Sequence, residues 1–342
     1  MKRVGYLFDK AFTYDSLYQA WLDASQGKRS RRAALEFSRN LAGNLDMLYQ
    51  ELRSGQYQPQ PYHVFKVYEP KERLIYAPAF RDLVVQHAIY RLTYPIFNAS
   101  FTDHSFACRT GKGTHAAADY SHAALRATPA DSYLLQMDIK RFFYRIDRDI
   151  LRQQIERKIK DRRFVDVMMQ FAEYGQPVGI PIGNLLSQMY ALIYLNPLDH
   201  FAKRILKAKW YCRYVDDFII FGGTRADQLG MLSRIVQFLQ ETLHLELSHY
   251  SLHKIKRGIN FVGYRTWQRV RFIRKHSLFN FSRAVKSEQR DSIISILGHS
   301  RKTGSFRHLM NALFDHNPAM YLKLPRAWRE AVKAHVLSEA EA

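Results

Sequence analysis

The chain of 342 residues carries 52 Lys and Arg against 31 Asp and Glu, a formal net charge of +21. Hydrophobic residues make up 47% of it and aromatic residues 14%, which excludes extensive disorder and predicts a large core in two or three subdomains. The basic excess indicates a polyanionic partner, with nucleic acid as the first candidate and a membrane surface as the second. No apolar run approaches the ~20 residues of a spanning helix, so no membrane partner is expected.

Only two cysteines occur, Cys108 and Cys212, and their spacing fits no zinc motif. A disulfide scaffold is therefore not expected, and the usage suits a reducing compartment. Because the chain opens with no signal-peptide pattern, we expect a cytoplasmic protein.

The first 60 residues predict helices, because apolar positions recur at helical spacing over 14–24 and 37–52. Between these stretches, residues 28–32 form a basic cluster. Two interpretations of this cluster stay open: a solvated loop, or a contact to a phosphate backbone.

Residues 62–68 and 73–76 predict two strands joined by a turn at 69–72. This hairpin places Lys71 and Arg73 near its tip, where fixed cations could close on a triphosphate. An ordinary charged hairpin tip is the alternative, and it is a stronger alternative for Lys71 than for Arg73.

A helical stretch over 78–101 leads into a loop in which Gly111 and Gly113 accompany Arg109 and Lys112. Backbone amides in such a loop before a helix favour phosphate. The pattern is a weak signal on its own.

Three carboxylates stand at the ends of apolar strands. Asp138 ends the strand over 133–139, and Asp216 and Asp217 form the turn between two short strands over 210–221. Adjacent anions in apolar surroundings are costly unless they are paired or bound to a cation. Three such carboxylates suit two Mg²⁺ ions, and a pair of ions about 3.5–4 Å apart catalyses in-line phosphoryl transfer.

The segments around these carboxylates also have clear patterns. A helix is expected near 150–159, with Asp147 and Asp149 at its N-terminus, and Gly183 precedes an apolar helix that runs through Leu195. An amphipathic helix over 228–243 and short strands at 245–248 and 254–255 follow, and the helices expected at the end of the chain cover 283–297, 304–314 and 325–340.

Asp138 with Phe142 and Phe143, followed by Tyr214-Val215-Asp216-Asp217, resembles motifs A and C of the reverse transcriptases. The order of the other segments is similar over nearly the whole chain. The resemblance implies an α+β right-hand polymerase fold, with fingers, a palm containing an antiparallel sheet, and a helical thumb. The implied parts are an N-terminal helical extension over 1–60, fingers over 61–130, palm over 131–267 with a fingers segment at about 155–178, and thumb over 268–342.

The resemblance also implies roles for individual residues, with Phe143 as a steric gate against a 2′-hydroxyl and Phe142 as a core residue. The implied catalytic residues are Asp138, Asp216 and Asp217. The implied metal site consists of Asp138, Ile139, Asp216 and Asp217, with two Mg²⁺ ions that Mn²⁺ could replace. The implied nucleotide-binding residues are Lys71, Arg73, Phe143, Ile182, Gly183 and Gln188. The implied nucleic-acid-binding residues are Arg109, Lys112, Tyr214, Gly263 and Tyr264.

One segment discriminates among reverse transcriptases. Most begin it with Gln-Gly and end it with Ser-Pro, whereas this chain has Ile182-Gly183 and Ser187-Gln188, which resembles the diversity-generating retroelement enzymes. These bacterial or phage-encoded polymerases misincorporate opposite template adenines, and an aliphatic Ile182 cannot hydrogen-bond where a glutamine could. The resemblance implies a template RNA, a DNA or RNA primer, dNTPs, a structured noncoding RNA and a small basic accessory protein as partners.

Two residues depart from the retroelement pattern, Arg145 where a small residue is usual and Leu186 where threonine is common. They leave open a second hypothesis, an antiphage defence reverse transcriptase that works with a dedicated noncoding RNA. A third hypothesis is a polymerase-like scaffold that only binds RNA, and the intact set of three aspartates argues against it.

Overall fold

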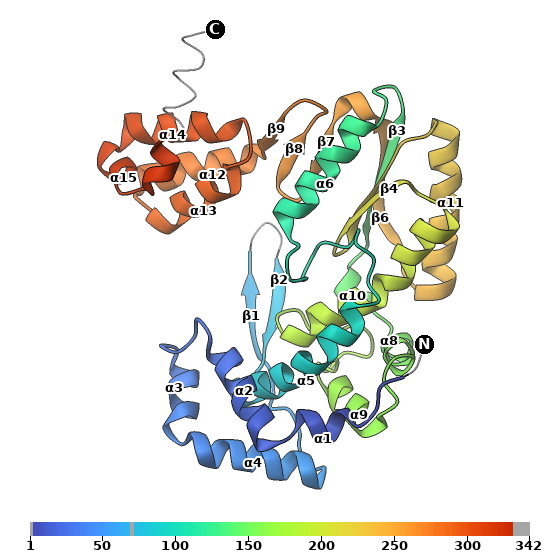
Figure 1. The fold of residues 1–342 in the computed structure, drawn as a ribbon, viewed down its shortest axis with the longest axis vertical. Helices are drawn as coiled ribbons and strands as arrows, with labels where there is room; N and C mark the ends of the chain where they lie inside the picture. Colours follow the sequence, from blue (N-terminus) through green and yellow to red (C-terminus); the bar gives the residue numbers. More distant parts are fainter. Residues whose placement is uncertain (1–2, 69–71, 331–342) are drawn as a thin grey trace. The chain divides into compact units, whose positions relative to one another are not determined.

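The computed structural model describes residues 3–68 and 72–330 and divides into two compact units (Figure 1). Unit 1 comprises Met1–Thr110, Gln136–Ile219 and Leu229–Ser251. Unit 2 comprises Gly111–Leu135, Ile220–Gln228 and Leu252–Ala342.

Unit 1 begins with helices and a hairpin. Its first elements are α1 (Leu7–Ala11), α2 (Tyr14–Ser25), α3 (Arg32–Arg39), α4 (Leu41–Ser54), β1 (His63–Val67), β2 (Arg73–Ala77) and α5 (Phe80–Asn98). The side chain of Thr13 caps α2 by accepting from the Ser16 amide, and α2 packs along α5. The two strands form an antiparallel hairpin, as the sequence predicts, and Val67 lies opposite Arg73.

The expected helix over 37–52 is wrong as a single element, because the backbone leaves helical geometry at Asn40 (φ −125°, ψ 55°). The basic cluster 28–32 is exposed and occupies the turn before α3 together with the first residue of that helix, so a solvated loop and a phosphate contact both stay open.

A four-stranded sheet carries the candidate carboxylates. Its strand order is β4 (Trp210–Tyr214), β5 (Asp217–Phe221), β3 (Tyr133–Ile139) and β6 (Leu247–Lys254). β6 is one strand where the sequence suggests two short ones. The accompanying helices are α7 (Phe142–Arg145), α8 (Arg148–Glu156), α9 (Arg162–Gln170), α10 (Leu185–His200), the π-helix η1 (Phe201–Ile205) and α11 (Arg225–Leu243).

Two helices of this set agree closely with the sequence. Asp147 caps α8, since its carboxylate accepts from the amides of Asp149 and Ile150, which confirms its expected position at a helix N-terminus. α10 is buried around most of its circumference, and Leu186 on it is fully buried. A threonine there would bring a hydroxyl into this core, so the departure at Leu186 is explained by packing.

Unit 2 combines α6 (Thr114–Ala127) with a small antiparallel sheet and a group of helices. The remaining elements are η2 (Ile255–Arg257), β7 (Ile259–Phe261), β8 (Tyr264–Thr266), β9 (Arg271–Ile273), α12 (Lys275–Lys286), α13 (Arg290–Ser300), α14 (Ser305–His316) and α15 (Pro318–Leu322). Its core contains Phe281, Leu297 and Met310.

The expected helix over 283–297 is wrong, because the chain ends α12 at Lys286 and turns through Glu288, whose φ of 54° is left-handed. The helix expected over 304–314 is confirmed by α14. Most of the one expected over 325–340 lies outside the described residues.

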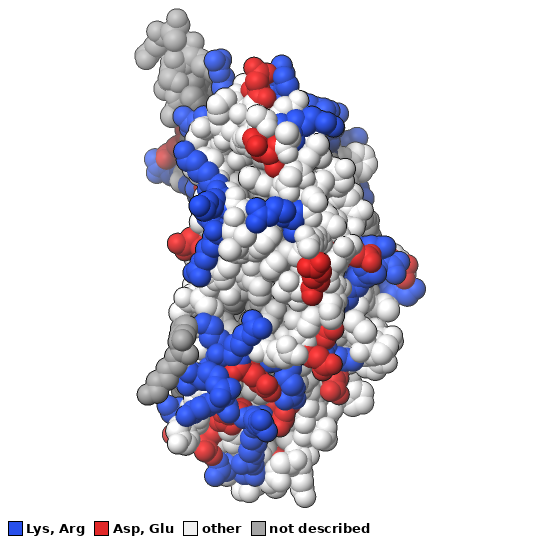
Figure 2. Space-filling model, turned by 90° about the vertical axis from the view of Figure 1, so that its right-hand side faces the viewer, with Lys and Arg blue, Asp and Glu red and all other residues white. Residues whose placement is uncertain are grey.

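Basic side chains are abundant on the surface. Figure 2 shows Lys and Arg in larger groups than Asp and Glu on the face that it draws, in keeping with the net charge of +21. None of the helices in the described part of the chain combines the length and hydropathy that a membrane crossing requires.

Candidate active site

The turn that carries the paired aspartates has an unusual backbone. Val215 and Asp216 connect β4 to β5, and Val215 has φ 56°. A β-branched residue in this left-handed region is a genuine outlier, since such turns normally use glycine, and the conformation costs on the order of 1–3 kcal/mol. Strain of this kind persists where surrounding contacts enforce it, and it is concentrated at functional sites.

The buried side chain of Arg213 holds this turn in place through hydrogen bonds. Its side chain is 1% exposed and donates from Nη1 to the carbonyl oxygen of Val215 over 2.9 Å. Nε and Nη2 donate to the two carboxylate oxygens of Asp199, both over 2.6 Å, and Nη2 also donates to Ser105 Oγ over 3.1 Å. Burial opposes the charge of Arg213, but the Asp199 carboxylate outweighs it and raises the pKa of Arg213 above its usual value.

This buried pair, which holds the turn through Arg213, was not predicted from the sequence. Asp199 is fully buried, and it also accepts from the Tyr211 hydroxyl over 2.8 Å. The available signal was one arginine in the middle of the apolar run 210–214, because a charge at an inward strand position needs a buried partner. The identity of that partner depends on tertiary structure.

The end of β3 is tied to the same turn. The amide of Ile139 donates to the carbonyl oxygen of Asp216 over 3.2 Å, and Gln136 Nε2 donates to Asp217 Oδ1 over 3.1 Å. From β6, the Ser248 hydroxyl donates to Asp138 Oδ2 over 2.5 Å. All three aspartates therefore lie at one edge of a single sheet.

Asp216 is a half-buried carboxylate with a second carboxylate, Asp138, close by. Burial raises the pKa of Asp216, and the neighbouring charge of Asp138 raises it further, while Arg73 and Arg213 act in the opposite direction. A carboxylate whose ionised form is disfavoured by a second carboxylate is suited to bind a cation.

The donor set fits a magnesium ion shared with a substrate. Mg²⁺ is usually held by one or two carboxylates together with substrate phosphates and water, and Asp138 and Asp216 provide two such carboxylates. In the described ranges, no group of three or more His, Cys, Asp or Glu side chains is arranged to hold a metal by itself. The hydrogen bond from Gln136 engages the third aspartate, Asp217.

The charge of the hairpin residue Arg73 acts on Asp216 and lowers the pKa of that carboxyl. Arg73 is exposed at the start of β2. Lys71, predicted beside it, lies outside the described residues. β2 is fixed next to the segment before α10, because the Tyr76 amide donates to the carbonyl oxygen of Ile182 over 2.7 Å.

Gly183 is required where this segment meets β2. Its φ is +117°, and an added Cβ would lie 2.7 Å from Ile75 Cγ2. We expect Gly183→Ala to lower the free energy of unfolding by about 1–3 kcal/mol, because it adds strain and overlap together. Urea denaturation measures this, with Gly230→Ala as the matched control: Gly230 lies in α11 with open space around it, so alanine there should not destabilise. Equal midpoints for the two variants would contradict the packing account.

The other residues predicted to bind the nucleotide differ in their exposure to solvent. Phe142 is 2% exposed and belongs to the core, as predicted, whereas Phe143 is half-buried. Ile182 is half-buried and Gln188 is exposed on α10. Phe143, Ile182 and Gln188 are thus accessible, and their roles stay predictions.

One of the predicted nucleic-acid contacts needs correction. Tyr264 is 1% exposed, and its hydroxyl hydrogen-bonds with His115 Nδ1 over 2.9 Å and donates to the His299 carbonyl over 2.8 Å, so its ring cannot abut a primer. Arg109 is half-buried and donates from Nε and Nη1 to Asn98 Oδ1 and to the carbonyls of Thr102 and Ser105, and its role in binding nucleic acid stays a prediction.

The other predicted contacts to nucleic acid involve residues that are at least partly exposed, and they stay predictions. Lys112 and Tyr214 are half-buried. Gly263 has φ +90°, and an added Cβ would lie 2.8 Å from His299 Nε2, so the glycine is explained by packing within unit 2.

The departure at Arg145 also has a structural explanation. Arg145 Nη1 lies 2.6 Å from Glu246 Oε2, and Lys140 Nζ lies 3.5 Å from the same oxygen. This cluster joins α7 to the segment before β6, next to the edge that carries Asp138.

The sequence and the fold can be compared with known proteins. Residues 69–266 match the family described as reverse transcriptase (RNA-dependent DNA polymerase). Protein YkfC of Escherichia coli K12 is 26% identical over 298 residues, covering 72% of this chain and 76% of that protein. The group II intron-encoded protein LtrA of Lactococcus lactis is 29% identical over 170 residues, covering 46% of this chain and 28% of that protein.

Among solved structures, apo telomerase from Candida tropicalis is similar with a TM-score of 0.50 at 13% identity, over 81% of this chain and 59% of that one. This likeness shows the fold, which is the right-hand polymerase fold of mixed helix and sheet. The family match covers more than half of the chain and includes both strands that carry the aspartates. The chain therefore belongs to the reverse transcriptases, the family of RNA-directed DNA polymerases.

Proposed function

We propose that this chain is the error-prone polymerase of a diversity-generating retroelement, which copies a template RNA into DNA. The polymerase part rests on one observation above all: a strained turn holds Asp216 next to Asp138, with Arg73 within electrostatic reach. The retroelement part rests on Ile182-Gly183 and Ser187-Gln188, which differ from the usual motif of the family.

The proposed roles follow from where each group lies. Asp138, Asp216 and Asp217 would hold two divalent ions, which when bound would activate the primer 3′-hydroxyl and neutralise charge on the triphosphate. Arg73 presents a positive charge to the same triphosphate from β2. Phe143, half-buried beside the core residue Phe142, presents a ring to the sugar of the incoming nucleotide.

We propose that Ile182 causes the errors opposite template adenines. Its carbonyl is engaged by the Tyr76 amide, which fixes the backbone, and its half-buried side chain has no hydrogen-bonding group. We therefore expect the nascent base pair to be less constrained in this chain than in family members that have a glutamine at the position of Ile182.

Ile182→Gln is expected to reduce misincorporation opposite template adenine by roughly 2- to 10-fold, since one hydrogen bond contributes about 0.5–1.5 kcal/mol. Sequencing of the DNA made on a defined RNA template measures the error rate at each base. The matched control is Val178→Gln, an exposed aliphatic residue 49% accessible in the same segment, which should leave the spectrum unchanged.

Two other results would count against the proposal. An error rate that is equal at all four template bases in the unmodified enzyme would contradict the retroelement role and favour the antiphage alternative. A spectrum that shifts equally in Ile182→Gln and Val178→Gln would contradict the assignment to Ile182.

A further inference from the structure

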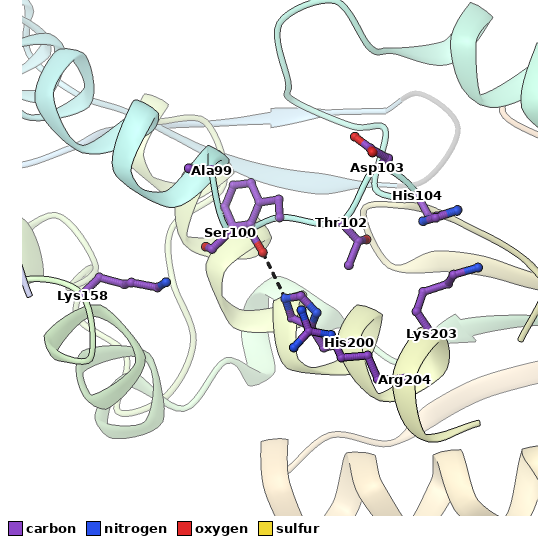
Figure 3. A pocket seen from close by; sticks show the side chains of 10 residues that line it. Ala99, Ser100, Thr102, Asp103, His104, Lys158, His200, Lys203 and Arg204 are labelled. Atoms are coloured by element: carbon purple, nitrogen blue, oxygen red, sulfur yellow. Dashed lines mark hydrogen bonds between the residues drawn. The ribbon is translucent and has the colours of Figure 1, made fainter. Parts of the chain in front are cut away.

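A basic pocket of about 540 Å³ lies in unit 1, outside the site of the three aspartates. Figure 3 shows its walls: the loop over 99–104 that follows α5, Lys158 after α8, and the junction of α10 with η1. The volume is within the ~300–1,000 Å³ range of ligand pockets. The polymerase account leaves this pocket without a role.

The charge of the walls favours an anion. Lys158, Lys203 and Arg204 contribute three positive charges against one carboxylate, Asp103, and His104 and His200 complete the polar lining (Figure 3). The shared chemistry of a suitable ligand is the phosphate group.

Lys203 and His200 are held in position before any ligand binds. Lys203 Nζ donates to the carbonyls of Ala208 and Lys209 over 2.8 and 2.9 Å, which uses two of the three N–H donors of an ammonium group. His200 Nε2 lies 3.0 Å from the carbonyl oxygen of Ser100, so the ring donates from Nε2 across the pocket wall (Figure 3). Such preorganisation reduces the entropy lost on binding.

The two walls are also fixed relative to each other. Asp199 and Ser105, the neighbours in sequence of His200 and His104, both accept hydrogen bonds from the buried Arg213. The Arg213 amide in addition donates to the carbonyl oxygen of His104 over 2.9 Å. One buried side chain therefore ties the loop over 99–104 to the α10–η1 junction that carries Lys203 and Arg204.

We propose that this pocket binds backbone phosphates of an RNA strand and forms a second nucleic-acid contact of unit 1. The proposal rests on the proposed function only for the identity of the strand as RNA. The pocket is much larger than a single phosphate needs, and its exposed member Arg204 lies at the surface, where a long strand can reach it. Contacts to phosphate position a strand and do not read its sequence.

The test is the salt dependence of RNA binding, measured by fluorescence anisotropy with a labelled single-stranded RNA of about 20 nucleotides. The buffer contains EDTA and no dNTPs, so the result does not depend on polymerase activity. Each lost phosphate contact lowers the magnitude of the slope of log K against log salt by about 0.7 for single strands. The double variant Lys158→Gln with Arg204→Gln should therefore lower the magnitude of this slope by about 1.4. It leaves Lys203 and its contacts to the two carbonyls unchanged.

The matched control is Lys10→Gln with Arg225→Gln, which removes two exposed positive charges elsewhere. Equal slopes for the pocket variant and this control would overturn the proposal. Charge reversal, Lys158→Glu with Arg204→Glu, should weaken binding further if the first variant has folded normally by circular dichroism.

A separate arm distinguishes RNA from a free anion. If inorganic phosphate raises the melting temperature of the unmodified protein but not of the pocket variant, while the RNA slopes stay equal, the pocket takes a small anion and the RNA assignment is wrong. Loss of nucleotide incorporation in Asp216→Asn with unchanged RNA binding would leave this proposal standing.

Discussion

Asp216→Asn is expected to reduce nucleotide incorporation on an RNA template by about 10³-fold or more while leaving the fold intact. The substitution keeps the shape of the side chain and removes the charge that faces Asp138, so a cation shared by the two loses a ligand. Burial and Asp138 already disfavour the ionised form of Asp216. Removal of this charge should therefore not lower the free energy of unfolding. Single-turnover primer extension with Mg²⁺ measures the rate.

The control for this variant is Asp15→Asn, which changes an exposed carboxylate in α2 in the same way. Its rate should equal that of the unmodified protein. Asp216→Asn with incorporation within a few-fold of normal would contradict the placement of the active site at this turn.

Asp199→Ala is expected to lower the free energy of unfolding by about 3–5 kcal/mol, which would make it the most destabilising of the variants considered. Asp199 is fully buried, and its removal leaves the buried charge of Arg213 without a partner. Urea denaturation checks this, with Glu36→Ala as the control, because the pair Arg32–Glu36 is exposed and should leave the midpoint unchanged.

A double variant separates stability from positioning. Asp199→Leu with Arg213→Met should recover part of the lost stability, because it removes both buried charges but leaves the Tyr211 hydroxyl and Ser105 Oγ without these partners. It should still lose activity, since the Val215 carbonyl no longer receives its hydrogen bond and the strained turn can relax. Full activity in the double variant would contradict the positioning role of Arg213.

Local patterns explain what could be predicted from the sequence. The strands of the first hairpin, the strand that ends near Asp138 and the turn at Asp216 follow from alternation and turn residues within a few positions of each other. The helix that begins at Leu185 follows from a glycine and an apolar run. Each of these signals is complete within its own segment.

What the sequence could not predict depends on contacts between distant segments. Arg213 and Asp199 are 14 residues apart and meet only because α10 lies beside β4. The burial of Tyr264 depends on His115 and His299, which come from two other helices. The breaks at Asn40 and Glu288 interrupt continuous helical patterns, and no glycine or proline marks either of them.

The central claim is that Asp138 and Asp216 together create a site for divalent metal. Electron paramagnetic resonance titration with Mn²⁺, in the presence of primer, RNA template and a non-hydrolysable dNTP, tests it without requiring turnover. We expect two bound ions for each unmodified chain, and the loss of at least one in both Asp138→Asn and Asp216→Asn. Unchanged Mn²⁺ stoichiometry and affinity in these two variants would contradict the account.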